Sequence, residues 1–147
     1  LVQFKDSTGK GMDWVESVVK YERPDIVILD MGDKFADIRA ERTDITLKAA
    51  AIHARNIAKQ YDCAVVWMSQ LSAEAEGRAD LNQAMMEGSK TGKAAEADLM
   101  VLIGKTQQAE GEEEDPIRYL NIAKNKLNGF QGKITCQLDG SRSLYTA

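Results

Sequence analysis

The stretch that decides the fold reads Pro24-Asp25-Ile26-Val27-Ile28-Leu29-Asp30-Met31. Its four consecutive apolar residues, three of them β-branched, end in a carboxylate. A run without alternation between apolar and polar residues is typical of a parallel strand that is covered on both faces. We therefore predict a buried strand that holds Asp30 at the carboxyl edge of a parallel sheet, where open α/β folds bind ligands.

A second stretch repeats the pattern, because Cys63-Ala64-Val65-Val66-Trp67-Met68 is followed by Ser69-Gln70. The segment between the two, from Thr43 to Tyr61, keeps apolar residues at the 3.6-residue period of a helix, with Asp44 as its expected cap. A strand, a helix and a strand in this order predict a right-handed crossover and two parallel strands. Polar groups at both strand ends indicate a nucleotide site of the Walker type. The alternative is a plain buried strand with a polar cap.

Composition limits the class of protein. The chain has 147 residues, 44% hydrophobic and 29% charged, which is ordinary for one globular domain. We expect a cytoplasmic protein, because no apolar run approaches the roughly 20 residues of a membrane span and no signal peptide is evident. The net charge of −4 gives no global attraction for nucleic acid, so any such site must be a local patch.

The cysteines and the histidine carry no predicted chemistry. Cys63 and Cys136 lie in strand-like runs and are expected to be buried, reduced thiols. His53 is the only histidine, which excludes a histidine-based metal cluster, and we expect it on the helix, partly exposed.

The remaining elements predict an α/β fold whose carboxyl-terminal third is a β-meander. Leu1–Phe4 is expected to be a strand, and Asp13 to cap a helix from Trp14 to Tyr21. Residues 72–93 are polar and predict a long, mobile, functional loop with one helical turn near residues 81–86. Further strands are expected at Leu99 to Ile103, Arg118 to Lys126, Lys133 to Leu138 and Ser143 to Tyr145.

Two segments resemble a phosphate-binding Walker A loop, and both fail the motif. Gly88-Ser89-Lys90-Thr91-Gly92-Lys93-Ala94 has three residues between its glycines where the motif has four, and it lacks Ser or Thr after the lysine. Ser7-Thr8-Gly9-Lys10-Gly11 lacks the first glycine. The phosphate-binding half of a Walker site is therefore expected outside this sequence.

Residues suited to the other half of such a site are present. Asp30 suits a Walker B aspartate, which orients Mg²⁺, usually through a water. Gln70 suits a polar sensor of the γ-phosphate. Lys124 and Lys126 lie two residues apart on a predicted strand and share a face. They suit phosphate contacts or fingers that reach a neighbouring subunit, although lysines that guard an exposed edge strand account for them equally well.

Taken in order, three motifs resemble the carboxyl-terminal part of the RecA-like ATPase domain of DnaB-type replicative helicases, phage versions above all. They are Met68-Ser69-Gln70-Leu71-Ser72, Glu96-Ala97-Asp98-Leu99-Met100-Val101-Leu102-Ile103 and Ile122-Ala123-Lys124-Asn125-Lys126-Leu127-Asn128-Gly129. The resemblance runs from about Leu1 to Tyr145. It implies a RecA-like P-loop NTPase core, here a single-domain fragment of residues 1–147 without its Walker A segment.

The resemblance also implies site residues and partners. ATP and Mg²⁺ would be the cofactors, with Asp30 holding the metal and Ser69 and Gln70 near the nucleotide. Single-stranded DNA would contact Arg78, Lys90 and Lys93. Lys124 and Lys126 would act in trans within a hexameric ring, with Lys126 in place of the family's arginine, whose bidentate fork it lacks.

The parent would then be an ATP-dependent DNA helicase in the cytoplasm, that of the host if a phage encodes it, and the isolated fragment would be inactive. Two alternatives remain open from the sequence. One is a RecA/RadA- or KaiC-like ATPase with the same core. The other is a non-catalytic α/β binding module that has lost its phosphate loop.

Overall fold

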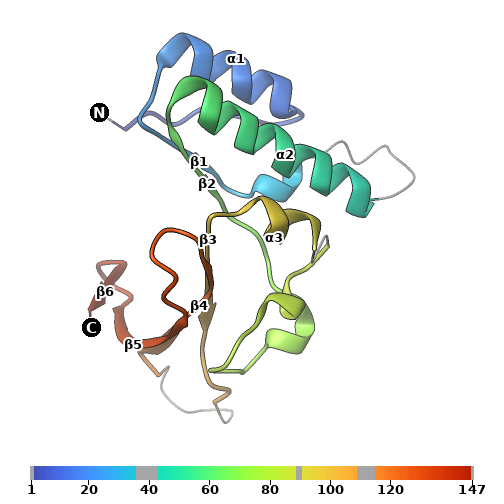
Figure 1. Ribbon diagram of the computed structural model, residues 1–147. Helices are drawn as coiled ribbons and strands as arrows, with labels where there is room; N and C mark the ends of the chain where they lie inside the picture. The colour runs from blue at the N-terminus through green and yellow to red at the C-terminus, as the bar shows by residue number, and fades with distance from the viewer. Residues whose placement is uncertain (1, 36–42, 89–90, 109–114, 147) are drawn as a thin grey trace. The chain divides into compact units, whose positions relative to one another are not determined.

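The computed structural model (Figure 1) describes residues 2–35, 43–88, 91–108 and 115–146. The chain divides into two compact units. The first contains Leu1–Ser69 with Thr91–Glu96, and the second contains Gln70–Lys90 with Ala97–Ala147. Each is described separately below. The expectation of one domain, based on chain length, stays a prediction.

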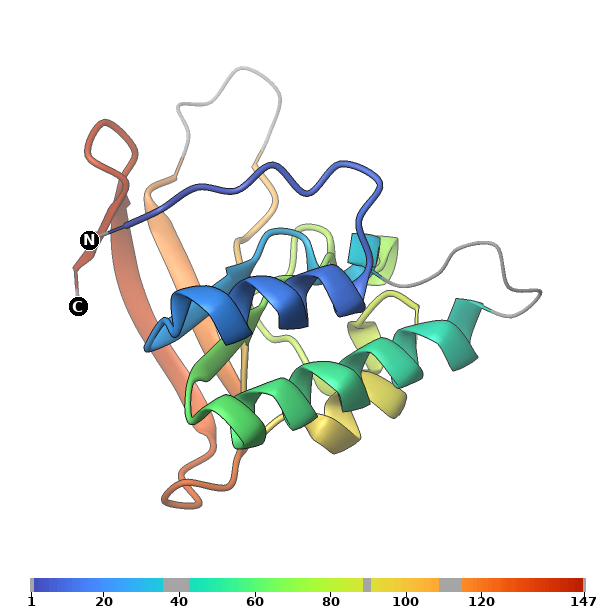
Figure 2. The same ribbon diagram turned by 90° about the horizontal axis from the view of Figure 1, so that it is seen from above.

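The first unit is an α/β layer. Its helices are α1 (Met12–Glu22), α2 (Thr43–Tyr61) and the short α3 (Gly92–Glu96), and its strands are β1 (Ile26–Leu29) and β2 (Ala64–Trp67). The strands pair in parallel, from Ile26 opposite Ala64 to Leu29 opposite Trp67, as the strand–helix–strand order predicted. Helices α1 and α2 run side by side (Figures 1 and 2).

One face of the β1–β2 sheet packs against the helices. Val19 of α1 and Ile57 of α2 are each 1% exposed, and Val27, Leu29 and Val65 lie against the same cluster. The other face is open within the described residues, since Ile26 and Ile28 are 60% and 63% exposed. The prediction that β1 is covered on both faces is therefore not met here, because α1 and α2 cover a single face.

Helix α2 has the predicted bounds, whereas α1 begins earlier than predicted. Gly11 is its N-cap, and no side chain caps it, so the prediction that Asp13 caps this helix is wrong. Asp13 lies inside the first turn of α1, and Asp44 lies inside the first turn of α2. There each carboxylate faces the positive end of the helix dipole. Residues 2–4 form no strand, which corrects the prediction for the described part of Leu1–Phe4.

A polar contact links α1 to α2. Glu16 accepts a hydrogen bond from the Tyr61 hydroxyl at 3.1 Å and contacts His53 Nε2 at 2.7 Å. The hydrogen bond to His53 holds the pKa of Glu16 below its ordinary value. His53 is thus a half-buried helix residue, as expected. Cys63 and Cys136 are buried free thiols, and burial raises the pKa of Cys63.

The second unit is an antiparallel meander with a long preceding segment. Strands β3 (Leu99–Gly104), β4 (Ile117–Asn125), β5 (Gly132–Asp139) and β6 (Leu144–Thr146) pair in chain order and can be followed from gold to red in Figure 1. The predicted meander is confirmed. No helix among the described residues is long and apolar enough to span a membrane.

The turn after β1 requires a glycine at position 32. The short 3₁₀ helix η1 (Gly32–Phe35) begins there, and the Gly32 amide donates to the Met68 carbonyl at 2.9 Å. A Cβ atom at position 32 would overlap the indole ring of Trp67. The strand tip that carries Asp30 therefore lies directly beside the end of β2.

Gly32→Ala is expected to destabilise the first unit by about 1–3 kcal/mol, because an added methyl group must displace a packed aromatic ring. Chemical denaturation followed by tryptophan fluorescence measures this loss. Gly140→Ala is the matched control, since a Cβ at position 140 meets no atom within 4 Å. Equal stability of the two variants would show that the indole ring has room to move.

Candidate functional site

Polar residues follow the carboxyl ends of both parallel strands. Asp30 comes directly after β1 and is exposed, and Ser69 and Gln70 come shortly after β2. Met68 N–H donates to the Leu29 carbonyl at 3.1 Å, so the strand pairing continues to this edge. Asp30 and Ser69 belong to the first unit, whereas Gln70 is the first residue of the second.

Asp33, a residue that sequence reasoning did not single out, is the centre of a polar cluster in the first unit. Its Oδ1 atom accepts from Trp67 Nε1 at 2.9 Å, and its Oδ2 atom accepts from Ser69 Oγ at 2.6 Å. Lys93 Nζ donates to Oδ1 at 3.0 Å, to Oδ2 at 2.9 Å and to Ser69 Oγ at 2.7 Å. All three hydrogens of the ammonium therefore have acceptors.

This cluster is an internal ion pair. The Lys93 side chain is 4% exposed and that of Asp33 is 22% exposed. Removing one member of a buried pair leaves an uncompensated charge and typically costs about 3–5 kcal/mol. The expectation that Lys93 offers its charge to DNA phosphates from an exposed loop is therefore not met in this structure, because Asp33 and Ser69 enclose the ammonium.

Lys93 lies on α3, which the sequence reading did not predict. Arg55 of α2 holds the other end of this helix through a hydrogen bond from its Nη1 atom to the Glu96 carbonyl. Its Nε atom also lies 3.9 Å from Glu96 Oε2. Both contacts fall within the first unit, so α3 is fixed there at each end by a charged side chain.

The segment expected to be a mobile loop is closed on itself in its described part, residues 70–88. Glu87 N–H donates to the Gln70 carbonyl at 3.3 Å, and Ser72 N–H donates to the Met85 carbonyl at 2.8 Å. Two short helical turns follow this neck, η2 (Ala73–Ala75) and η3 (Gln83–Met85). The second lies where one helical turn was predicted.

A buried asparagine docks this loop on the meander of the second unit. Asn121 of β4 is 7% exposed. Its Oδ1 atom accepts from Leu81 N–H at 3.3 Å, and its Nδ2 atom donates to the Ala79 carbonyl at 2.9 Å. Sequence reasoning missed this role, although a polar amide inside an apolar strand run is an unusual choice that could have indicated it.

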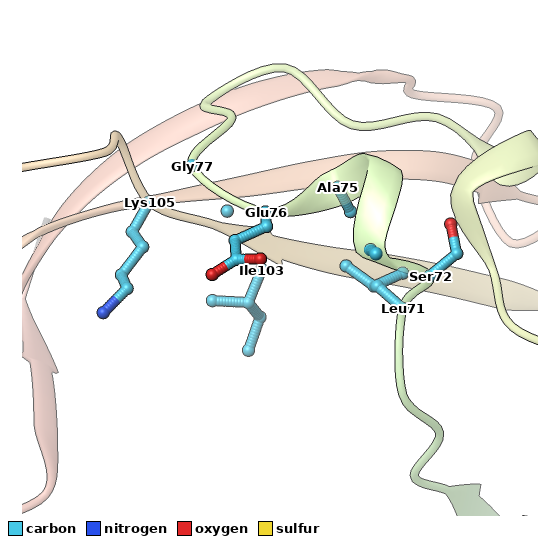
Figure 3. A pocket seen from close by; sticks show the side chains of 9 residues that line it. Leu71, Ser72, Ala75, Glu76, Gly77, Ile103 and Lys105 are labelled. Atoms are coloured by element: carbon cyan, nitrogen blue, oxygen red, sulfur yellow. The ribbon is translucent and has the colours of Figure 1, made fainter.

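An open pocket of about 300 Å³ lies where the loop meets β3 (Figure 3). Leu71 and Ile103 contribute apolar surface, and the side chains of Glu76 and Lys105 extend beside them. None of the nine residues that line the pocket was predicted to bind ATP or DNA. The pocket therefore adds no support to the predicted nucleotide site.

The predicted site residues of the second unit lie in different places. Arg78 is exposed on the loop. Lys124 lies on β4, opposite Met100. Lys126 lies just beyond the end of β4, where its Nζ atom is 3.5 Å from Asp98 Oδ1. Lys90 lies outside the described residues.

Known structures place this architecture. No protein-family model and no curated protein matches the sequence. The solved ATPase domain of one DnaB-like helicase superposes with a TM-score of 0.78 at 16% identity, covering 93% of this chain and 51% of that one. A second DnaB-like replicative helicase, solved to study its interactions with primase, gives 0.76 at 18% identity, covering 97% and 37%. The chain has the fold of DnaB-like helicase ATPase domains.

The match confirms the RecA-like α/β fold and the DnaB-like resemblance predicted from the sequence. At 16% and 18% identity it establishes the fold and not the roles of individual residues. The chain spans about half of one DnaB-like neighbour and little more than a third of the other.

Asn121→Leu is expected to release the loop at residues 79–81, because a backbone N–H and a carbonyl lose their buried partner at about 1–3 kcal/mol each. Trypsin should then cut after the exposed Arg78 at least about tenfold faster than in the wild type. Asn56→Leu, an exposed position on α2, is the control. An unchanged cleavage rate in Asn121→Leu would mean that other contacts hold the loop.

Proposed function

We propose that this chain is part of the motor of an ATP-dependent replicative DNA helicase. The observation that carries the proposal is the match of nearly the whole chain to the ATPase domains of two DnaB-like proteins. The position of Asp30 directly after β1, at the ligand-binding edge of a parallel sheet, supports it. ATP and Mg²⁺ are the proposed cofactors, and single-stranded DNA is the proposed track.

Asp30 is the proposed magnesium-orienting carboxylate. Among the described residues there is no group of three or more His, Cys, Asp or Glu side chains that could hold a metal. Asp30 would therefore orient the ion singly, usually through a water, while the phosphates of ATP supply further oxygen ligands. Its exposure leaves the carboxylate accessible for this role.

Gln70 is the proposed sensor of the γ-phosphate. Its carbonyl is held by Glu87 N–H, so the backbone of the residue is fixed while its side chain is exposed. Ser69 suits a direct nucleotide contact less well, because its hydroxyl already donates to Asp33 and accepts from Lys93. We assign Ser69 a supporting role beside Gln70.

DNA contact is proposed for the loop that carries Arg78, with Lys90 following it in the chain. Lys93 is better suited to hold the base of that loop than to contact phosphate, because its ammonium is enclosed.

Lys124 and Lys126 are the proposed fingers that act on the nucleotide of an adjacent subunit in a hexameric ring. The ion pair between Lys126 and Asp98 is compatible with this role. Both side chains are about half exposed, at 45% and 53%, and the two atoms are 3.5 Å apart. An exposed pair of this kind contributes only about 0–1 kcal/mol, so Lys126 can exchange Asp98 for a phosphate at little cost.

Asp30→Ala in the full-length protein is expected to lower ATP turnover on the order of a hundredfold or more, because the oriented metal supplies several kcal/mol of charge stabilisation. A coupled ATPase assay with and without Mg²⁺ measures the effect. Asp25→Ala is the matched control, since Asp25 is an exposed carboxylate just before the other end of the same strand. Near-normal turnover in Asp30→Ala would reduce Asp30 to a strand cap.

A subunit-mixing experiment tests the trans role of Lys126. Lys126→Ala is expected to cost on the order of a thousandfold in turnover, since a finger stabilises charge in the transition state. Mixing these subunits with Asp30→Ala subunits should partly restore turnover, because some interfaces then pair an intact Asp30 with an intact Lys126.

The control for this experiment mixes Asp30→Ala with Lys20→Ala, an exposed lysine on α1. That mixture should show only the activity of its Lys20→Ala subunits, diluted by the inactive partner. Absence of rescue in rings whose mass is confirmed as hexameric would remove the trans role. Lys126→Arg is expected to be tolerated, because it restores the residue type of the resembling family.

A further inference from the structure

One carboxylate holds both ends of the loop. Ser69 comes immediately before the loop and donates to Asp33 Oδ2 at 2.6 Å. Lys93 comes shortly after the loop and donates to both oxygens of the same carboxylate. Ser69 and Lys93 also contact each other at 2.7 Å. The chain thus leaves the first unit and returns to it at a single polar cluster.

The contacts of Lys93 make this cluster difficult to open by a small movement. A lysine ammonium that is 4% exposed cannot replace a lost acceptor with bulk water. The same helix is held through Arg55 and Glu96 at its other end. A shift of α3 therefore has to break several charge-assisted bonds together, which favours one defined closed arrangement over a range of partly open ones.

The cluster is continuous in sequence with the neck of the loop. Ser69 is bonded covalently to Gln70, whose carbonyl accepts from Glu87 N–H at 3.3 Å. At its other end, Asp33 is separated from Asp30 only by Met31 and the tightly packed Gly32. One short turn therefore carries both the proposed magnesium carboxylate and the carboxylate that holds the ends of the loop.

We propose that Asp33 is a positioning residue that couples the DNA-contacting loop to the nucleotide site. Asp33, Ser69 and Lys93 form a clasp that closes the base of the loop and fixes the backbone of Gln70. A change in the turn after β1 reaches both loop ends through this carboxylate, and a change in the loop reaches the turn the same way. The consequence for turnover rests on the proposed function, whereas the clasp itself is a property of the fold.

Hydrogen exchange tests the clasp without any assay of activity. In the full-length protein, Asp33→Asn is expected to speed exchange of peptides that contain the neck amides of Ser72 and Glu87 at least about tenfold. Peptides from β3 and β4 that lie outside the neck should exchange as in the wild type. Unchanged neck exchange would overturn the clasp, and so would equal acceleration throughout the chain, which indicates general unfolding.

Three further variants keep the test decisive if Asp33→Asn folds poorly. Ser69→Ala removes one neutral bond and leaves the ion pair, so it should speed neck exchange by a smaller factor. The double variant Asp33→Asn with Lys93→Met buries no unpaired charge, so it should fold well and still show a fast neck. Lys34→Met, an exposed lysine on the same short helix as Asp33, should leave neck exchange unchanged. A slow neck in the double variant would overturn the proposal.

The coupling is tested by the DNA dependence of turnover in the full-length protein, with an unstructured deoxythymidine oligonucleotide as the probe. The double variant should need at least about tenfold more oligonucleotide for half-maximal stimulation, because its loop must become ordered on binding. A loss of folded protein would lower the maximal rate without moving that concentration. An unchanged half-stimulating concentration would refute the coupling. A wild-type parent that hydrolyses no ATP would refute the proposed function and leave the exchange result as an independent test of the clasp.

Discussion

The buried ammonium of Lys93 is the constraint on which the first unit depends. Moving a charge out of water costs several kcal/mol unless geometry and hydrogen bonds compensate for it. Here both oxygens of Asp33 and the hydroxyl of Ser69 supply that compensation. The requirement fixes the turn after β1, because Asp33 must face Lys93 while Gly32 allows Trp67 to lie close enough to donate to the same carboxylate.

The elements that sequence reasoning predicted are those whose signals are local. Helix α2 was predicted with its observed bounds, because apolar residues at a 3.6-residue period recur over its whole length. The β1–β2 pair followed from two apolar runs with a helix between them, and the meander followed from short strands separated by turns. The start of α1 was predicted less well, since Gly11 caps it without a side-chain signal and Asp13 offered a stronger one.

The arrangement around Asp33 could not be predicted, because its partners are far apart in the chain. Lys93 and Asp33 are separated by 60 positions, and a lysine in a glycine-rich polar stretch has the local pattern of an exposed cation. Asp33 likewise has the local pattern of a turn residue. Only tertiary packing brings the two together, and burial then reverses the meaning of the lysine from a phosphate ligand to an internal counter-ion. The same reasoning applies to Asn121, whose partners at Ala79 and Leu81 are about 40 positions away.

The charge of the loop limits how the proposed motor would bind DNA. Residues 70–88 contain one basic residue, Arg78, and four acidic ones. Asp80 pairs with Lys133 at 2.6 Å, which offsets part of that negative charge but presents no further cation from this stretch. Each phosphate contact adds only about 0.7 to the salt slope on single strands, so a loop of this composition binds a phosphate backbone weakly by itself. Useful affinity then has to come from several loops that engage one strand at once, since linked sites bind far more tightly than each site alone. Ring assembly is therefore a condition for DNA binding in this proposal, as well as the source of its trans-acting fingers. The ends of the loop must be held in a defined position for such a ring to align its loops along a strand, and this is the property that a buried, fully bonded carboxylate at their base provides.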